Sequence, residues 1–271
     1  MKNQVTKHSV IVLIITALII LGCKKDTDPD RQIERCKLAS YLINGYPTHI
    51  IYDEDGFLLS RNDINPDKKG IICDQDIKGN LSRVLNHSDL ILGDTLIADY
   101  VYVEGNLQTL RYYDRQYDIN GGPSKKQILT CNFYYGKSEK PDSMQVIKSR
   151  VDSSGNEYPY EPTRIDRFSY DNNGNLTKQE IVKQELNGRF MLASINYHTY
   201  DSKPNYLKKM KQIYFFIDQS IPYMFSKNNL LSTRREVPGK LTSEISYKVI
   251  YDGDMVKNDG MGFSEMKWSC E

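Results

Sequence analysis

The hydrophobic residues of this chain fall into one long run near the N-terminus and many short runs after it. Residues 48–52, 100–103, 110–113 and 245–251 are rich in β-branched and aromatic side chains, and each is bounded by Gly, Asn, Asp or Pro. This pattern is typical of β-strands separated by turns. Runs at helical period are scarce, and residues 206–216 are the best helix candidate. The pattern predicts a predominantly all-β fold, an antiparallel meander of hairpins in an open curved sheet.

The predicted turns share one plan, in which a strand ends, Asp follows, and polar residues lead to Gly. The stretches are "YDEDGFL" (52–58), "VDSSGNE" (151–157), "YDNNGNL" (170–176) and the shorter "YDGD" (251–254). Asp accepts hydrogen bonds from backbone amides just ahead of it, and Gly tolerates the positive φ that closes a hairpin loop. The turn-forming residues predicted from these stretches are Asp53, Gly56, Asp152, Gly155, Asp171 and Gly174.

A further turn is predicted at Asn187 and Gly188, within "QELNGRFML" (184–192). Asn-Gly is the strongest sequence signal for a two-residue hairpin loop, because both residues tolerate positive φ. The sequence therefore predicts a long antiparallel pair formed by residues 175–186 and 189–200.

The N-terminal run ends at a cysteine. Residues 10–21 carry no charge, follow Lys2 and Lys7, and are too few for a membrane-spanning helix, which needs about 20 residues. The sequence Ile20-Leu21-Gly22-Cys23 resembles the lipobox of bacterial lipoproteins. The resemblance implies that residues 1–22 are a signal peptide cleaved before Cys23 and that Cys23 carries the lipid. Two or more acyl chains would give a stable membrane anchor.

Residues 24–30 contain one proline and otherwise only polar residues, and residues 23–35 are expected to form a flexible tether. Residues 36–271 then form the β-rich domain, and a division into two lobes near 136–144 stays open. The Cys-Lys-Lys-Asp start resembles lipoproteins of Bacteroidota-type bacteria. That resemblance implies the outer membrane, with the surface-exposed side slightly favoured over the periplasmic side.

A second resemblance covers residues 165–252. The stretch "YDNNGNL" (170–176) is similar to the YD repeat of secreted β-shells, and the later "YDSKPN" (200–205) and closing strand (247–251) look like uncharacterised YD-repeat-like lipoproteins of the Bacteroidota. This resemblance implies a β-rich extracytoplasmic module without an assigned active site. The repeats here are few and irregular, so a closed shell is in doubt.

Charge and cysteine content narrow the classes of function. Without residues 1–22, 34 basic residues remain against 35 acidic ones, so no basic surface for nucleic acid is expected. The remaining cysteines are Cys36, Cys73, Cys131 and Cys270. Their wide spacing argues against a zinc site. An extracytoplasmic compartment permits disulfides, and the three ways of pairing these cysteines all stay open.

Catalytic and metal-binding motifs are missing from the sequence. After signal removal the histidines are His49, His87 and His198, and no nucleophile elbow, zinc motif or phosphate-binding loop occurs. Residues 169–180 partly match an EF-hand calcium loop, but Ser169 stands where a ligating Asp should be and the flanks read as strands. The sequence therefore predicts no catalytic residue, no metal and no cofactor.

The function predicted from these observations is a membrane-anchored envelope lipoprotein that binds or scaffolds a glycan or a protein. Its 20 tyrosines could supply the contact surface, because Tyr is enriched at interfaces. Packing on strands is the ordinary role of such rings, and the ligand-binding residues stay unknown. Two alternatives remain open, a polysaccharide-active hydrolase and a half-barrel carrier of lipid or lipoprotein.

Overall fold

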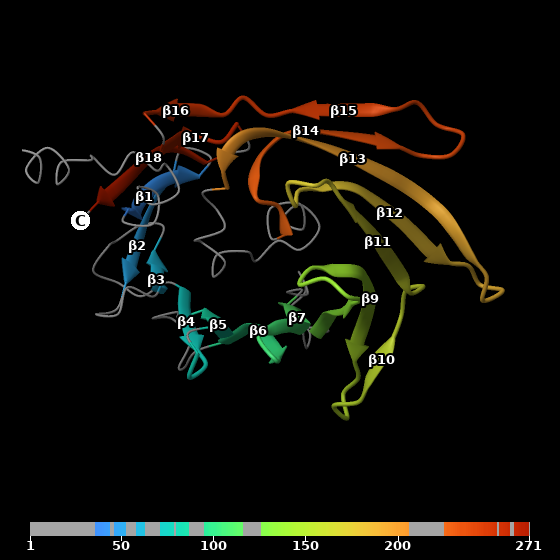
Figure 1. Cartoon of the computed structure of the whole chain (residues 1–271). Helices are drawn as coiled ribbons and strands as arrows, with labels where there is room; N and C mark the ends of the chain where they lie inside the picture. The colour runs from blue at the N-terminus through green and yellow to red at the C-terminus, as the bar shows by residue number, and fades with distance from the viewer. Residues whose placement is uncertain are drawn as a thin grey trace, which may run out of the picture.

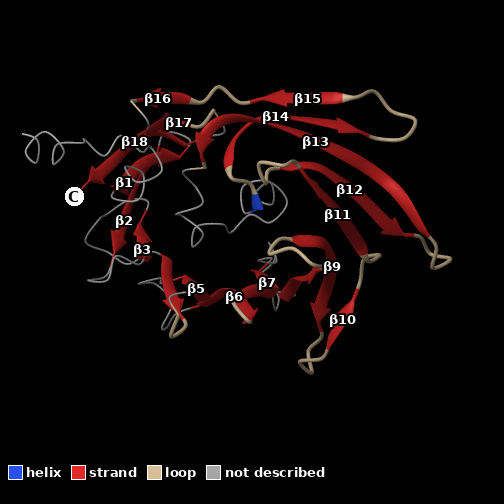
Figure 2. Cartoon of the chain, viewed as in Figure 1, coloured by secondary structure: helices blue, strands red, loops and turns tan. Residues whose placement is uncertain are grey.

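The fold is known from a computed structural model, which describes residues 36–43, 46–52, 58–62, 71–78, 80–86, 95–115, 126–205, 225–253, 255–260 and 263–270. The predicted signal peptide, Cys23, the predicted tether, Asp53, Gly56, His87 and the helix expected at 206–216 lie outside these residues. The described residues are mostly strands (Figure 2). The strands are β1 (Cys36–Ile43), β2 (Tyr46–Tyr52), β3 (Leu58–Asn62), β4 (Ile71–Gln75), β5 (Leu81–Asn86), β6 (Thr95–Val103), β7 (Asn106–Arg115), β8 (Lys126–Tyr135), β9 (Pro141–Val151), β10 (Glu157–Pro159), β11 (Arg164–Tyr170), β12 (Leu176–Gln184), β13 (Phe190–Pro204), β14 (Asn228–Glu236), β15 (Ser243–Ser246), β16 (Ile250–Asp252), β17 (Met255–Asn258) and β18 (Phe263–Cys270).

The strands confirm the predicted antiparallel meander. A 16-stranded sheet runs in the order β15-β14-β13-β12-β11-β9-β8-β7-β6-β5-β4-β3-β2-β1-β18, and β10 pairs with β9 beside this path. The sheet curves strongly but does not close into a barrel (Figure 1). Residues 136–144 form the β8–β9 loop and the start of β9, and both strands belong to this one sheet.

Two of the Asp-Gly stretches, 151–157 and 170–176, form hairpin loops of one geometry. The amide of Asp171 donates to the carbonyl of Asn175 over 3.0 Å, and the amide of Gly174 donates to the carbonyl of Asp171 over 3.0 Å. Gly174 has φ +84°, which an L side chain rarely adopts. Asp152 and Gly155 make the equivalent bonds. A three-residue loop that ends in a left-handed Gly follows in each case.

The Asn187-Gly188 loop differs from the prediction in length. Residues 175–186 and 189–200 pair as expected, through β12 and β13. However, Glu185 and Arg189 close the hairpin, and Gly188, with φ +83°, has positive φ whereas Asn187 does not. The loop therefore has three residues. Asn187 acts through its side chain, since its Oδ1 accepts the amide hydrogen of Arg189 over 2.8 Å.

One face of the sheet carries the hydrophobic core, and we call it the inner face. Residues opposite each other on neighbouring antiparallel strands lie on the same face. From β4 to β9 one group of inward residues is apolar and buried, and we call these residues the apolar sector. They are Cys73, Val84, Ala98, Tyr100, Leu110, Cys131, Phe133, Met144 and Val146.

Four tyrosines, three of them at strand ends, bond to the backbone of neighbouring strands. The hydroxyls of Tyr135, Tyr170 and Tyr200 donate to the carbonyls of Leu107, Pro141 and Leu176 over 3.0, 3.0 and 2.6 Å. Tyr52 bonds the carbonyl of Leu38 in the same way. These rings are partly buried against the core, and burial raises the pKa of Tyr135 to about 12. The tyrosines therefore join adjacent hairpins at one end of the sheet.

The two-stranded sheet β16–β17 contacts both ends of the large sheet. On one side Trp268 of β18 donates its indole hydrogen to the carbonyl of Val256 over 2.8 Å. On the other side the Tyr251 hydroxyl donates to Asp201 of β13, and Asn229 of β14 donates to Tyr251 over 2.9 Å. The small sheet therefore bridges β13 and β14 to β18 (Figure 1).

Candidate ligand-binding face

The inner face changes from apolar to polar between β9 and β11. One row across the sheet places the buried Phe133 and Met144 beside Asp166, and the next places Cys131 and Val146 beside Arg164. On β11–β13 most of the inward positions in and beside these rows carry polar side chains. We call them the polar sector, which consists of Arg164, Asp166, Gln179, Ser194, Asn196 and His198.

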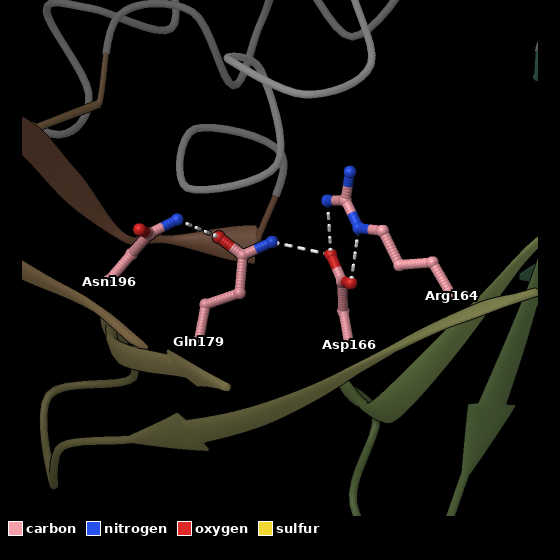
Figure 3. A network of polar contacts seen from close by, with 4 residues as sticks. All are labelled: Arg164, Asp166, Gln179 and Asn196. Atoms are coloured by element: carbon pink, nitrogen blue, oxygen red, sulfur yellow. Dashed lines mark hydrogen bonds and ion pairs between the residues drawn. The ribbon is translucent and has the colours of Figure 1, made fainter. Parts of the chain in front are cut away.

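Four of these residues form one hydrogen-bonded network (Figure 3). Arg164 donates from Nε and Nη2 to the two carboxylate oxygens of Asp166, over 2.6 and 2.7 Å. Gln179 donates to Asp166 over 2.6 Å, and Asn196 donates to the Oε1 atom of Gln179 over 3.1 Å. Because Asp166 is fully buried, this bidentate pairing offsets the cost of removing its charge from water.

Three polar atoms on β13 are buried without a hydrogen-bond partner among the described residues. They are Ser194 Oγ, Asn196 Oδ1 and His198 Nε2. Their residues alternate along the strand, so the three side chains project from one face about 7 Å apart. Such atoms are rare in folded proteins, because each one lacks the hydrogen bond it makes in water. The row is therefore suited to receive hydrogen bonds from a ligand.

His198 is held neutral in this row. Its Nδ1 atom lies 3.0 Å from the Thr233 hydroxyl, and desolvation by burial lowers its pKa from 6.5 to about 4. A neutral imidazole either donates or accepts at Nε2, depending on its tautomer.

The carboxylates predicted to shape turns are engaged in those turns. Hydrogen bonds from Asn156 lower the pKa of Asp152. Burial acts to raise the pKa of Asp171, but hydrogen bonds from the Asn175 amide and side chain outweigh it and lower the pKa. Residues 169–180, the partial match to a calcium loop, form the β11–β12 hairpin. Among the described residues, no cluster of His, Cys, Asp and Glu has metal-binding geometry.

Few of the described tyrosines are exposed enough to form the expected contact surface. Tyr134 and Tyr158 are the described tyrosines among the exposed large hydrophobic side chains, and they lie on β8 and β10. The others pack against strands or the core, where their rings contribute more by burial than they would in water. A tyrosine contact surface therefore stays a prediction for these two exposed rings, while most of the other described rings are used for packing within the fold.

The cysteines separate into two groups. Cys36 is disulfide-bonded and lies opposite Cys270 in the pairing of β1 with β18. Cys73 and Cys131 are buried thiols on the inner face.

A helix that crosses a membrane must be long and apolar. None of the helices of the described residues is long and apolar enough to cross a membrane.

Comparison with known proteins shows the fold alone. No protein-family model matches the chain, and no curated protein matches it. A solved structure described as a porin-like protein from Bacteroides vulgatus ATCC 8482 has a similar fold, with a TM-score of 0.51 over 86% of this chain and 97% of that chain. The two sequences are 11% identical. The comparison therefore establishes a β-rich fold of a kind that also occurs in Bacteroides.

Sequence reasoning missed the polar sector. Arg164, Asp166 and Gln179 have no motif spacing, and Ser194, Asn196 and His198 show only the two-residue period of any strand. The polar period within β13 was a usable signal, since a polar stripe on the side facing the core is unusual.

Proposed function

We propose that this protein is a non-catalytic binding module of the cell envelope, that it is anchored by a lipid on Cys23, and that its polar sector contacts a glycan. The observation that carries the proposal is the row of buried, unpartnered atoms on Ser194, Asn196 and His198. Each unsatisfied buried group costs about 1–3 kcal/mol, so a ligand that supplies the missing hydrogen bonds recovers that free energy on binding.

The chemistry of the row favours hydroxyl groups as ligand. Ser194 Oγ donates or accepts, Asn196 Oδ1 only accepts, and His198 Nε2 does either. A hydroxyl both donates and accepts, so it fits all three atoms. A glycan presents hydroxyls at regular intervals along a chain, as the row presents its partners along a strand.

The geometry of the network argues against hydrolysis. A glycosidase needs two carboxyl groups, one on each side of the bond to be broken. In the network of Figure 3 Asp166 is the one carboxylate, and it is engaged by Arg164 and Gln179. A carboxylate that is paired in this way holds the neighbouring side chains in position.

The apolar sector packs into the hydrophobic core, so it does not line a cavity for a lipid. This packing argues against a lipid carrier.

The lipid anchor is proposed from Ile20-Leu21-Gly22-Cys23. In cells, wild-type protein should partition with membranes and take up labelled fatty acid. The Cys23→Ala variant should stay unprocessed or appear in soluble fractions. Equal membrane association of both forms would refute the anchor.

The binding function is tested with the soluble fragment 24–271, which lacks the anchoring Cys23, on a glycan array and in a panel of polysaccharide hydrolysis assays. We expect glycan binding that Asn196→Ala weakens about tenfold, the effect of losing one or two hydrogen bonds. Thr199→Ala is the matched control, because Thr199 is exposed on the opposite face of the same strand. Hydrolysis that disappears in Asp166→Asn would overturn the non-catalytic proposal.

A further inference from the structure

A second cluster of polar and aromatic side chains lies on the inner face at the far end of β8, β9 and β10. Gln127, Arg150 and Tyr158 stand opposite one another and form one row. Tyr160 follows β10, and its hydroxyl donates to the Oε1 atom of Gln127 over 2.9 Å. The Arg150 guanidinium lies 4.2 Å from the centre of the Tyr160 ring. The guanidinium is therefore held in place by stacking.

Arg150 differs from the other arginines with close contacts. Arg111, Arg164 and Arg234 each form an ion pair with a carboxylate, at 2.5, 2.6 and 3.2 Å. Arg150 has no ion pair with a carboxylate of the described residues, and its buried Nε has no hydrogen-bond partner there. The neighbouring Lys148 is paired with Glu161 at 2.8 Å. The cluster therefore keeps one positive charge that no carboxylate of the described residues contacts.

The cluster is open to solvent on one side. Tyr158 is 46% exposed, directly beside Arg150 on the neighbouring strand. The Tyr158 ring offers an apolar surface, and the Arg150 guanidinium beside it offers a pair of N–H donors that point the same way. That pair matches the two oxygens of a carboxylate, and stacking on Tyr160 lowers the entropy lost on binding.

We propose that this cluster recognises the carboxylate of an acidic sugar, with the carboxylate on Arg150 and the sugar ring against Tyr158. The inference rests on the proposed glycan-binding function and names the class of glycan, one that contains uronic acids. The polar sector begins on β11, the strand next to β9, and lies on the same face of the sheet. A single glycan chain can therefore contact both the Arg150 cluster and the polar sector.

The test compares binding of the mature protein to polygalacturonate and to its methyl ester, which has the same backbone without the charge. Wild type should bind the acid form about tenfold more tightly, the value of one charge-assisted contact, and added salt should reduce the difference. Arg150→Gln should abolish this preference, and Tyr158→Ala should weaken binding of both forms. Arg234→Gln is the control, because Arg234 also stacks on a tyrosine, Tyr197 at 4.7 Å, but has Glu236 as counter-charge.

The outcomes separate the two proposals. Equal wild-type binding of both forms, or a preference that survives Arg150→Gln, would overturn the carboxylate assignment and leave the glycan-binding function standing. Preference for a sulfated glycan over the carboxylated one would also overturn it. If no glycan binds, both proposals fail together. Unchanged melting temperatures of the variants exclude misfolding as the cause of any loss.

Discussion

The apolar sector on β4–β9 and the polar sector on β11–β13 occupy one face of one sheet, and they are built for different purposes. Phe133 and Asp166 lie in the same row of paired residues, two strands apart, and both are buried. Burial of Phe133 stabilises the fold. Burial of Asp166 removes a charge from water, and the hydrogen bonds from Arg164 and Gln179 only compensate for that cost.

The two sectors differ in what they contribute to the stability of the fold. The apolar sector packs into one core cluster, whereas the polar sector leaves Ser194, Asn196 and His198 each with an unsatisfied buried atom. Natural proteins tolerate such costs where a site must be ready for a ligand. Substitutions in the two sectors should therefore change the stability of the protein by different amounts, with different pH dependence and in one case with the opposite sign.

The largest effect is expected in the apolar sector. Phe133→Ala removes a side chain that is 2% exposed and contacts Phe225 edge-to-face at 5.6 Å between ring centres. The free energy of unfolding should fall by about 3–5 kcal/mol, measured by chemical denaturation. Tyr134→Ala, the next residue but on the opposite face, should cost less than about 1 kcal/mol because that ring is exposed. Equal losses would contradict the assignment of the two faces.

The polar sector should respond to pH through His198. Its pKa is about 4 in the folded protein and 6.5 when exposed, so below pH 6.5 the unfolded chain binds a proton that the folded chain does not. Stability is therefore lost as the pH falls from 6.5 to 4, by about 3 kcal/mol in total. Denaturation curves of wild type and His198→Gln should diverge across this window. Parallel pH profiles would contradict the lowered pKa of His198 in the folded protein.

An intermediate effect is expected where tyrosines join hairpins. Tyr170→Phe removes the hydrogen bond to the Pro141 carbonyl and leaves the ring in place. The loss should be about 1 kcal/mol in denaturant titrations. Tyr158→Phe, which changes an exposed ring, should leave stability unchanged. If the two variants have the same stability, the hydroxyl of Tyr170 contributes nothing to joining the hairpins.

The smallest effect should have the opposite sign. Ser194 is fully buried and its hydroxyl has no partner among the described residues. Ser194→Ala should therefore be neutral or stabilise by up to about 1 kcal/mol, while it weakens glycan binding. Thermal unfolding with and without ligand measures both. A loss of stability above about 1 kcal/mol would show that the hydroxyl is satisfied in the folded protein.

The sequence by itself predicted an antiparallel meander of short strands and the positions of several turns, but the single strand expected at 245–251 is divided between β15 and β16, which belong to different sheets. The predicted features depend on residues that are close in the chain. Asp171 bonds amides within four residues of itself, and Gly174 needs positive φ for its own loop. The loop at Asn187 shows the limit of such signals, because the same dipeptide suits loops of two or three residues, and the register of β12 with β13 selects between them.

Only the tertiary structure decided which side chains meet. Asp166, Gln179 and Asn196 are separated by 13 and 17 residues and touch because the pairing of β11, β12 and β13 aligns them. A period of two tells which residues share a face of one strand, but it does not tell which row of the next strand they join. The role of the tyrosines was open for the same reason. A ring at a strand end is equally suited to a partner or to a neighbouring carbonyl, and the fold places a carbonyl within reach.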